Sequence, residues 1–324
     1  MAFELFPSNQ IANIIIKDHV IRYTGVKQSV PLVVQKYRER YLPPGIVEEG
    51  KIIERDTLRL ILEECVSEWG ISKKQVRFTI PDSFVVIRRI TVPIDIKDDE
   101  IVGYLYSELG STIHLPFEEP VLDIKKLSEI EDKKEILLFA APEDIALSYS
   151  TLLQEVSLKP IAADISPLCM YRLFDFKDKT NIEDHILLIQ FDLSTVNLSI
   201  FHQHIPIFMR HIQLETSIDD WDIQNNRSGS KAEIKWVNGE KSLDSVIEEI
   251  YREIDHVLNF YQFSLMKGKQ AVTKILFSGD HPYINDMYSR VIDRYEISVS
   301  TLESIEKLPP NYYLPLGLAL KEVQ

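Results

Sequence analysis

The two halves of this chain begin in the same way, with three consecutive β-strand patterns joined by short turns. In the first half these patterns lie within residues 13–34, and in the second half within residues 186–212. β-Branched runs broken by short polar turns are typical of hairpins, and a pattern that returns once predicts an internal duplication. The 324 residues also exceed the ~250–300 that one hydrophobic core usually serves. We therefore expect an α/β protein with two related lobes.

Charge and hydropathy narrow the class of partner. The chain has 36 Lys and Arg against 50 Asp and Glu, a formal net charge of −14. A nucleic-acid binder needs a basic surface to displace counterions from phosphates, so we expect no nucleic-acid partner. The N-terminus lacks the basic segment of a signal peptide, and no apolar run approaches the ~18 residues of a membrane span. These features predict a cytoplasmic protein with no direct membrane insertion.

Strand and helix patterns divide the chain into two lobes and an insertion. Residues 84–140 follow the order strand, helix, strand, strand, which predicts a compact α+β unit within the first half. Residues 175–184 are dense in charged side chains and predict the boundary between the lobes. The predicted parts are a first lobe of residues 1–82 and 160–180, an inserted subdomain of residues 83–159, and a second lobe of residues 181–324 with a reduced variable region at about 213–270.

Several short motifs follow one another in an informative order. They are Pro44–Ile53, Phe78–Pro81, Arg88–Pro93, Ile113–Phe117 with Val121–Asp123, Glu249–Arg252, and the closing Gly317-Leu318-Ala319. In this order they resemble the PilM family, the actin-like proteins of type IV pilus assembly. The resemblance implies a two-lobed actin-like (ribonuclease H-like) α/β fold with a small α+β subdomain inserted in the first lobe.

The loops that hold nucleotide in this superfamily are altered here. In the segment aligned with the first phosphate loop, Ile15 stands at the acidic position and Lys17 at the glycine. The second loop keeps its acid as Asp192 but has Ser194 at the glycine, and the paired glycines of the adenosine loop are Gly279-Asp280. A side chain at such a glycine keeps the backbone N–H groups away from phosphate. We therefore expect an actin-like fold that has lost, or nearly lost, nucleotide binding, with no cofactor and no catalytic residue.

Two alternatives keep the chemistry of the superfamily. The first is an active ATPase with unorthodox loops, which would require ATP and Mg²⁺. Its phosphate, metal and ribose positions would be Lys17, Asp18, Asp192, Ser194, Thr195, Glu249 and Gly279. The second is a metabolite kinase or phosphatase, which needs intact glycine loops and is disfavoured for that reason. His202 and His204, together with His211, suggest a metal site, but residues 201–206 are a predicted hairpin tip and no nearby Cys or carboxylate completes a zinc-type ligand set, so we expect none.

The favoured function is a non-catalytic scaffold of a type IV pilus or of a related secretion or transformation assembly. The resemblance implies a PilN-like inner-membrane partner, whose cytoplasmic N-terminal peptide docks between the first lobe and the insertion. The groove residues that we predict are Val86, Arg88, Ile90, Leu122 and Ile124. The protein would then lie at the cytoplasmic face of the membrane through its partners, among other pilus assembly proteins, with self-association left open.

Overall fold

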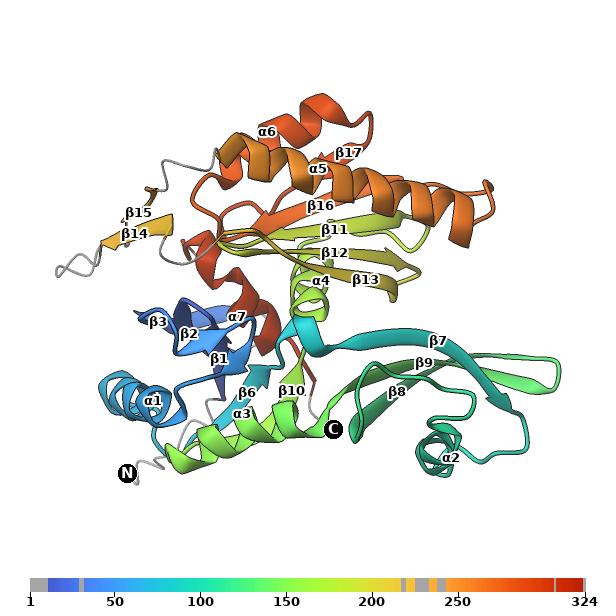
Figure 1. Ribbon diagram of the computed structural model, residues 1–324, viewed down its shortest axis with the longest axis horizontal. Coiled ribbons are helices and arrows are strands. Elements are labelled where there is room, and N and C mark those ends of the chain that lie inside the picture. Colours follow the sequence, from blue (N-terminus) through green and yellow to red (C-terminus); the bar gives the residue numbers. More distant parts are fainter. Residues whose placement is uncertain are drawn as a thin grey trace, which may run out of the picture.

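The computed structural model describes residues 11–28, 32–216, 220–224, 233–237, 243–305 and 307–322. Two lobes lie one above the other, and a smaller subdomain extends from the lower lobe beneath the upper one (Figure 1). Each lobe is built on a five-stranded mixed sheet. Within the described residues, no helix is long and apolar enough to cross a membrane.

The first lobe is led by a β-hairpin. Its sheet has the order β10-β6-β1-β2-β3, in which β1 pairs antiparallel with β2 and parallel with β6. The strands are β1 (Ala12–Lys17), β2 (Val20–Gln28), β3 (Val33–Tyr41), β6 (Gln75–Thr79) and β10 (Lys159–Asp164). Helices α1 (Arg55–Trp69) and α3 (Glu143–Glu155) share one apolar core with β1. A short hairpin, β4 (Val47–Glu48) and β5 (Lys51–Ile52), precedes α1.

The second lobe repeats this topology, as the repeated strand pattern predicts. Its sheet has the order β13-β12-β11-β16-β17, again with one antiparallel and one parallel neighbour for the leading strand. The strands are β11 (His185–Phe191), β12 (Thr195–His202), β13 (Ile205–Gln213), β16 (Lys274–Gly279) and β17 (Ser298–Ser300). Helices α5 (Leu243–Asn259) and α6 (Ile284–Arg294) cover its outer face. A two-stranded hairpin, β14 (Trp221–Gln224) and β15 (Glu233–Trp236), lies to one side.

Two helices fill the space between the sheets. They are α4 (Ser166–Phe176) and α7 (Tyr313–Ala319), and they pack against Ile15 of β1 and Ile186 and Leu188 of β11 (Figure 1). Neighbouring β1 residues Ile14 and Ile16 point to the opposite, outer core, because strand side chains alternate between faces. The near-continuous apolar runs of β1 and β11 are thus explained by burial on both faces.

The insertion is a three-stranded antiparallel sheet of order β7-β9-β8 with one helix. Its elements are β7 (Val86–Pro93), α2 (Ile101–Glu108), β8 (Pro120–Ile130) and β9 (Lys133–Pro142). The element order agrees with the predicted strand, helix, strand, strand. The predicted insertion of residues 83–159 also includes α3, whose Tyr149, Leu152 and Leu153 are buried in the first-lobe core.

Two predicted elements differ in extent from the observed ones. The strand predicted at residues 32–34 is part of β3, which runs on to Tyr41. β3 is an edge strand with alternating exposure, so its charged residues weaken the apolar signal. The helix predicted from Ser242 to Leu265 is α-helical only to Asn259 and ends in a π-helical turn, Phe260–Leu265. Much of the predicted variable region lies outside the described residues.

Candidate functional site in the cleft between the lobes

Charged side chains from both lobes meet in the cleft. Lys17 ends β1, Asp192 follows β11, and Asp280 follows β16. Lys17 Nζ lies 2.8 Å from Asp192 Oδ2 and 3.2 Å from Asp280 Oδ2. Arg22 of β2 also bonds to Asp280 Oδ2, and its Nε donates to Glu39 Oε2 at 3.1 Å. Lys17 and Arg22, the two cations of this cluster, are therefore each paired with carboxylates of this chain.

Burial changes the pKa values of the acids in these pairs. The Arg22 and Asp280 side chains are 4% and 3% exposed. Burial alone would raise the pKa of Asp280, but the charges of Lys17 and Arg22 hold it well below its usual range. Burial raises the pKa of Asp192 to about 7, against the opposing charge of Lys17. Asp280 therefore remains an anion in the cleft, bound by two cations.

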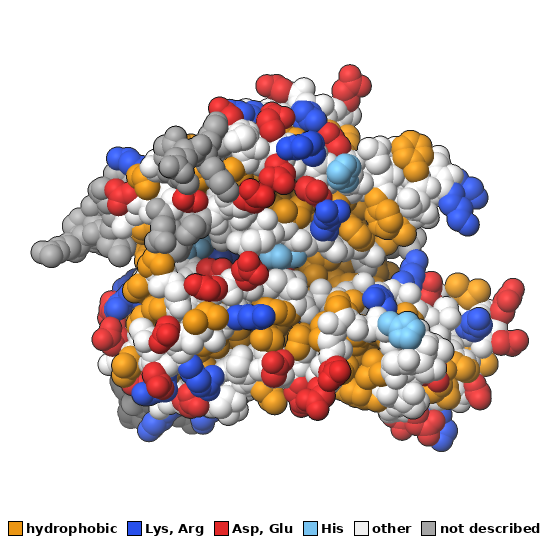
Figure 2. Space-filling model, in the orientation of Figure 1, with side chains coloured by type: hydrophobic (Ala, Val, Ile, Leu, Met, Phe, Trp, Pro, Cys, Tyr) orange, Lys and Arg blue, Asp and Glu red, His pale blue; other side chains and the backbone are white. Residues whose placement is uncertain are grey.

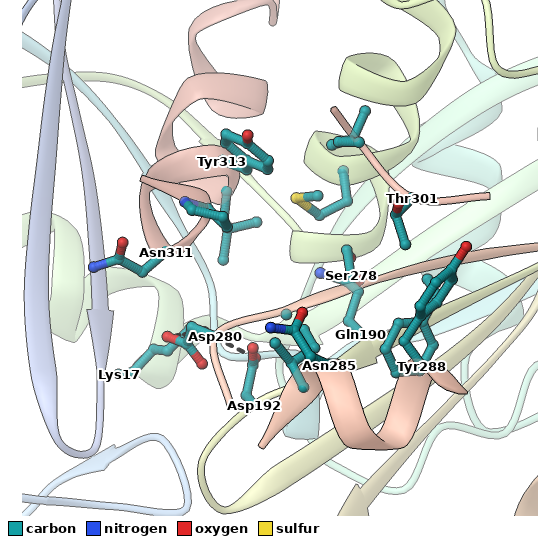
Figure 3. A pocket seen from close by; sticks show the side chains of 17 residues that line it. Lys17, Gln190, Asp192, Ser278, Asp280, Asn285, Tyr288, Thr301, Asn311 and Tyr313 are labelled. Atoms are coloured by element: carbon teal, nitrogen blue, oxygen red, sulfur yellow. Dashed lines mark hydrogen bonds and ion pairs between the residues drawn. The ribbon is translucent and has the colours of Figure 1, made fainter. Parts of the chain in front are cut away.

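A cavity of about 230 Å³ lies beside this ion-pair cluster, on the side of the second lobe (Figure 3). Its polar side chains include Gln190, Ser278, Asn285, Thr301 and Asn311. Its apolar wall is formed by Met170, Phe277, Ile284, Leu302, Pro310 and Leu314, with Tyr288 and Tyr313. Lys17, Asp192 and Asp280 lie together at one end (Figure 3).

A second, smaller cavity of about 70 Å³ shares Lys17 and Asp192 with the first. It is lined by Lys17, Asp18, Asp192, Ser194 and Thr195 among others, so five of the seven predicted nucleotide positions meet there. Asp18 is turned away from the cluster, because both of its oxygens accept backbone N–H bonds, from Glu49 at 2.8 Å and Gly50 at 3.0 Å.

The other two predicted nucleotide positions have different surroundings. Glu249 is exposed on α5 and lines neither cavity. Gly279 lines the first cavity and has φ 143°, and a Cβ there would lie 1.9 Å from the Phe191 carbonyl oxygen. The close approach of β16 to β11 therefore requires this glycine whether or not a nucleotide binds.

A buried polar network that the sequence did not indicate also joins the lobes. Asn197 of β12 donates through Nδ2 to Asp82 Oδ2 at 2.8 Å, and the Ser166 backbone N–H donates to Asp82 Oδ1 at 3.0 Å. Because the Asn197 amide nitrogen is used in this way, its Oδ1 accepts from His211 Nδ1 at 2.7 Å. Burial raises the pKa of Asp82 and lowers the pKa of His211. Asp82 thus ties the start of α4 to the second-lobe sheet.

The predicted peptide-groove residues share one face of the insertion sheet. Val86 and Leu122 both pair with Ala140, and Arg88 and Ile124 both pair with Leu138, so the sheet register aligns them. Ile90, Leu122 and Ile124 pack around the small core beneath α2, and Arg88 is exposed. The register therefore brings the five together, but several of them serve the insertion's own core.

Val86 also lines an open groove of about 590 Å³ where the insertion meets the first lobe, called the junction groove below. The other lining residues are Lys51, Ser83, Phe84, Pro116, Phe117, Glu118, Glu119, Pro142, Asp144 and Ile145. These residues come from β5, the start of β7, the loop before β8, and the β9–α3 corner. Hydrophobic and acidic side chains lie side by side in the lower half of the face shown in Figure 2.

Sequence reasoning missed three residues of the ion-pair cluster: Arg22, Glu39 and Asp280 in its pairing role. A signal for Asp280 was present, because Lys17 and Asp280 both replace glycines of nucleotide loops and carry opposite charges. The three histidines that were considered as a metal site have separate partners. His202 stacks on His185, and His204 Nδ1 lies 3.0 Å from the Tyr171 hydroxyl. His211 hydrogen-bonds Asn197. Among the residues that the structure describes, no group of three His, Cys, Asp or Glu side chains is arranged to hold a metal.

Two sheets of one topology, closed around a cleft and carrying a small insertion in the first lobe, define a two-lobed actin-like protein. Solved structures agree with this class. A chain of a PilM-PilN type IV pilus biogenesis complex is similar with a TM-score of 0.76 and 16% identity, covering 97% of this chain and 98% of that one. A Bacteroides thetaiotaomicron protein with an actin-like ATPase fold is similar with a TM-score of 0.51 and 8% identity, covering 99% and 100%.

The family follows from the sequence match. A model of the type IV pilus assembly protein PilM family matches residues 16–311. The chain therefore belongs to the PilM family of type IV pilus assembly proteins, as its motifs predicted. The ethanolamine utilization protein EutJ of Carboxydothermus hydrogenoformans shares the fold, with a TM-score of 0.50 and 10% identity over 97% of this chain and 90% of that one. No curated protein matches the sequence.

Proposed function

We propose that this protein is a non-catalytic scaffold of a type IV pilus or a related assembly, and that it holds the cytoplasmic N-terminal segment of a PilN-like inner-membrane protein. Membership of the PilM family supports the pilus role. The similar structure of a PilM-PilN complex supports the choice of partner. Through that partner the protein would lie at the cytoplasmic face of the membrane, beside other pilus assembly proteins.

The observation that carries the non-catalytic role is the ion-pair cluster. In a nucleotide-binding cleft, cations and backbone N–H groups are available to bind phosphates. Here Lys17 pairs with Asp192 and Asp280, and Arg22 pairs with Asp280. The carboxylate of Asp280 therefore occupies the place of a bound anion. Asp280 thus substitutes for a phosphate with a group of the chain itself.

The residues present do not fit a nucleotide's phosphates. A phosphate placed beside the cluster meets two carboxylates, and two like charges ~4 Å apart repel by about 4 kcal/mol at an effective dielectric constant of 20. To bind Lys17, the phosphate must also displace Asp192 from a 2.8 Å contact. We therefore assign no step to ATP or Mg²⁺.

The junction groove supports the partner-binding role. It lies between the first lobe and the insertion, where an extended segment can contact both. Its floor includes Phe84, Val86, Phe117 and Ile145, which supply apolar surface for side chains of a bound segment. Val86 is the one predicted groove residue that lines it.

Two calorimetric titrations test the proposal. Mg-ATP and Mg-ADP are titrated into the full chain, and no saturable heat is expected at millimolar nucleotide. A peptide of the PilN-like partner's cytoplasmic N-terminus is titrated separately, and saturable binding is expected. Saturable nucleotide binding would overturn the non-catalytic role in favour of the ATPase alternative, and absence of peptide binding would overturn the scaffold role.

A further inference from the structure

The junction groove combines an apolar floor with an acidic rim. The floor includes Phe84, Val86 and Phe117, all partly exposed. Three carboxylates, Glu118, Glu119 and Asp144, line the same groove and are exposed to solvent. Among the described residues that line the groove, Lys51 supplies the one ammonium group.

Several acids of the first lobe and the insertion form an ion pair, whereas these three carboxylates form none with the residues that the structure describes. Glu155 pairs with Arg55 at 3.0 Å, and Asp98 pairs with Lys134 at 3.1 Å. Among the described residues, no Lys, Arg or His forms an ion pair with Glu118, Glu119 or Asp144. Negative charge therefore exceeds positive charge among the described lining residues of the groove, with three carboxylates and one ammonium group.

Two positive contributions at the groove are too small to cancel it. Lys51 Nζ lies 5.8 Å from the centroid of the Phe84 ring, so its charge is directed over the aromatic face. The N-terminus of α3 also faces this corner, with a partial charge of about +0.5. Asp144 already meets that end of the helix, since its Oδ1 accepts the Ile145 N–H at 2.8 Å.

We propose that the junction groove selects a basic segment: an extended stretch of the membrane partner that places an apolar side chain on the Phe84–Phe117 floor and a neighbouring Lys or Arg against Glu118 and Glu119. This inference rests on the proposed function and adds the chemistry of the segment. In an extended chain, successive side chains point to opposite sides, so one residue can fill the floor while its neighbour reaches the rim. The net charge of −14 adds long-range attraction for such a segment.

The test uses the full chain and synthetic peptides of the partner's cytoplasmic N-terminal segment, with affinity measured by fluorescence anisotropy. One peptide has the natural sequence, and in a second each Lys and Arg is replaced by Gln. We expect the second peptide to bind about tenfold more weakly, and the natural peptide to weaken as salt rises from about 50 to about 300 mM. Glu118→Gln and Glu119→Gln should each cost about two- to fivefold in affinity, the size of an exposed ion pair.

Two further variants make the outcomes separable. Glu131→Gln removes an exposed acid at the far β8–β9 turn and should leave affinity unchanged. Phe117→Ser removes apolar floor and should weaken any peptide that uses the groove. If Phe117→Ser weakens binding while the Glu118 and Glu119 variants, the Gln peptide and salt have no effect, the basic-segment inference is wrong and the proposed function stands. If no peptide binds the unmodified chain, the proposed function fails, and the inference fails with it.

Discussion

Asp280 is the residue on which the charge balance of the cleft depends. It binds Lys17 and Arg22 together, and both cations are largely buried. Removing one partner of a buried ion pair typically costs about 3–5 kcal/mol, and because Lys17 keeps Asp192 and Arg22 keeps Glu39, the cost here should lie at the lower end of that range. We expect Asp280→Ala to lower the free energy of unfolding in urea by this amount.

A surface pair provides the matched control for Asp280→Ala. Glu68 lies 2.8 Å from Arg40, with 60% of its side chain exposed. Exposed pairs contribute about 0–1 kcal/mol, so Glu68→Ala should change stability little. Equal effects of the two variants would show that the cleft cluster is not the tightly held network described here.

Two buried histidines make the free energy of unfolding depend on pH, and their pKa shifts give the sign of this dependence. Burial lowers the pKa of His19 and of His281 to about 3, from 6.5. Unfolding therefore takes up protons between pH 6.5 and 3, and the free energy of unfolding falls as the pH is lowered through this window. Asp192, with its pKa raised to about 7, acts in the opposite sense between pH 7 and 3.8.

His281→Gln isolates one of these contributions. The variant replaces the titrating ring, whose Nδ1 accepts from the Tyr283 N–H at 3.2 Å, with a neutral polar side chain. Below pH 6, the free energy of unfolding of the variant should fall less steeply with falling pH than that of the wild type. Unfolding of the variant takes up one proton fewer, so the two slopes should differ by up to about 1.4 kcal/mol per pH unit. Urea unfolding at several pH values measures this, with exposed His256→Gln as the control for loss of a histidine. Parallel curves for His281→Gln and the wild type would contradict the assignment.

Residue-scale prediction from sequence succeeded where a motif set the expectation and failed where only tertiary contact does. Lys17 and Asp192 stood at positions known from the phosphate loops, and the structure brings them within 2.8 Å. Arg22 lies in a strand where a charged residue normally indicates an exposed face. Its burial comes from Asp280, 258 positions away, and no local pattern encodes that contact.

At the scale of elements, the close contact between α4 and α7 requires a glycine at position 317. A Cβ on Gly317 would lie 2.1 Å from the Cys169 carbonyl oxygen, so the two helix backbones must touch. We expect Gly317→Ala to destabilise the fold by about 1–3 kcal/mol through overpacking, measured by urea unfolding. Gly103→Ala is the control: Gly103 is helical, with nothing within 4 Å of its Cβ position, so alanine should be neutral or stabilising by up to about 1 kcal/mol. A harmless Gly317→Ala would mean that the helices can separate at this point.

Elements were predicted best where their pattern was strongly periodic and buried. β1 and β11, apolar on both faces, were found with nearly their observed bounds. β3 was cut short because exposed charges hide its alternation, and the π-helical end of α5 was missed because an apolar stripe continues through Phe260–Leu265. Periodicity reports which side chains are buried and does not distinguish α from π backbone bonding.

At the scale of the molecule, the contacts that join the lobes within the described part of the chain include the α4–α7 core, the ion-pair cluster, and the Asp82–Asn197 hydrogen bond. All three are made by groups of the chain itself, and under the proposed function no nucleotide adds to them. We expect the radius of gyration of the wild type, measured by small-angle X-ray scattering, to be the same with and without millimolar Mg-ATP. In an actin-like protein that uses nucleotide to join its lobes, the two values should differ.

Removing the polar contacts tests how closure is divided among the three sets. Asp280→Ala removes the ion pairs that Asp280 makes with Lys17 and Arg22 and leaves the Lys17–Asp192 pair in place, and Asn197→Ala abolishes the bond to Asp82. Because these networks are separate, we expect the double variant to have a larger radius of gyration and faster amide exchange in β1 and β11 than either single variant, with Glu68→Ala unchanged. An unchanged radius and unchanged exchange in the double variant would mean that the apolar α4–α7 core, with the remaining Lys17–Asp192 pair, is enough to hold the lobes together. Asp280 and Asn197 would then have no part in holding the cleft closed.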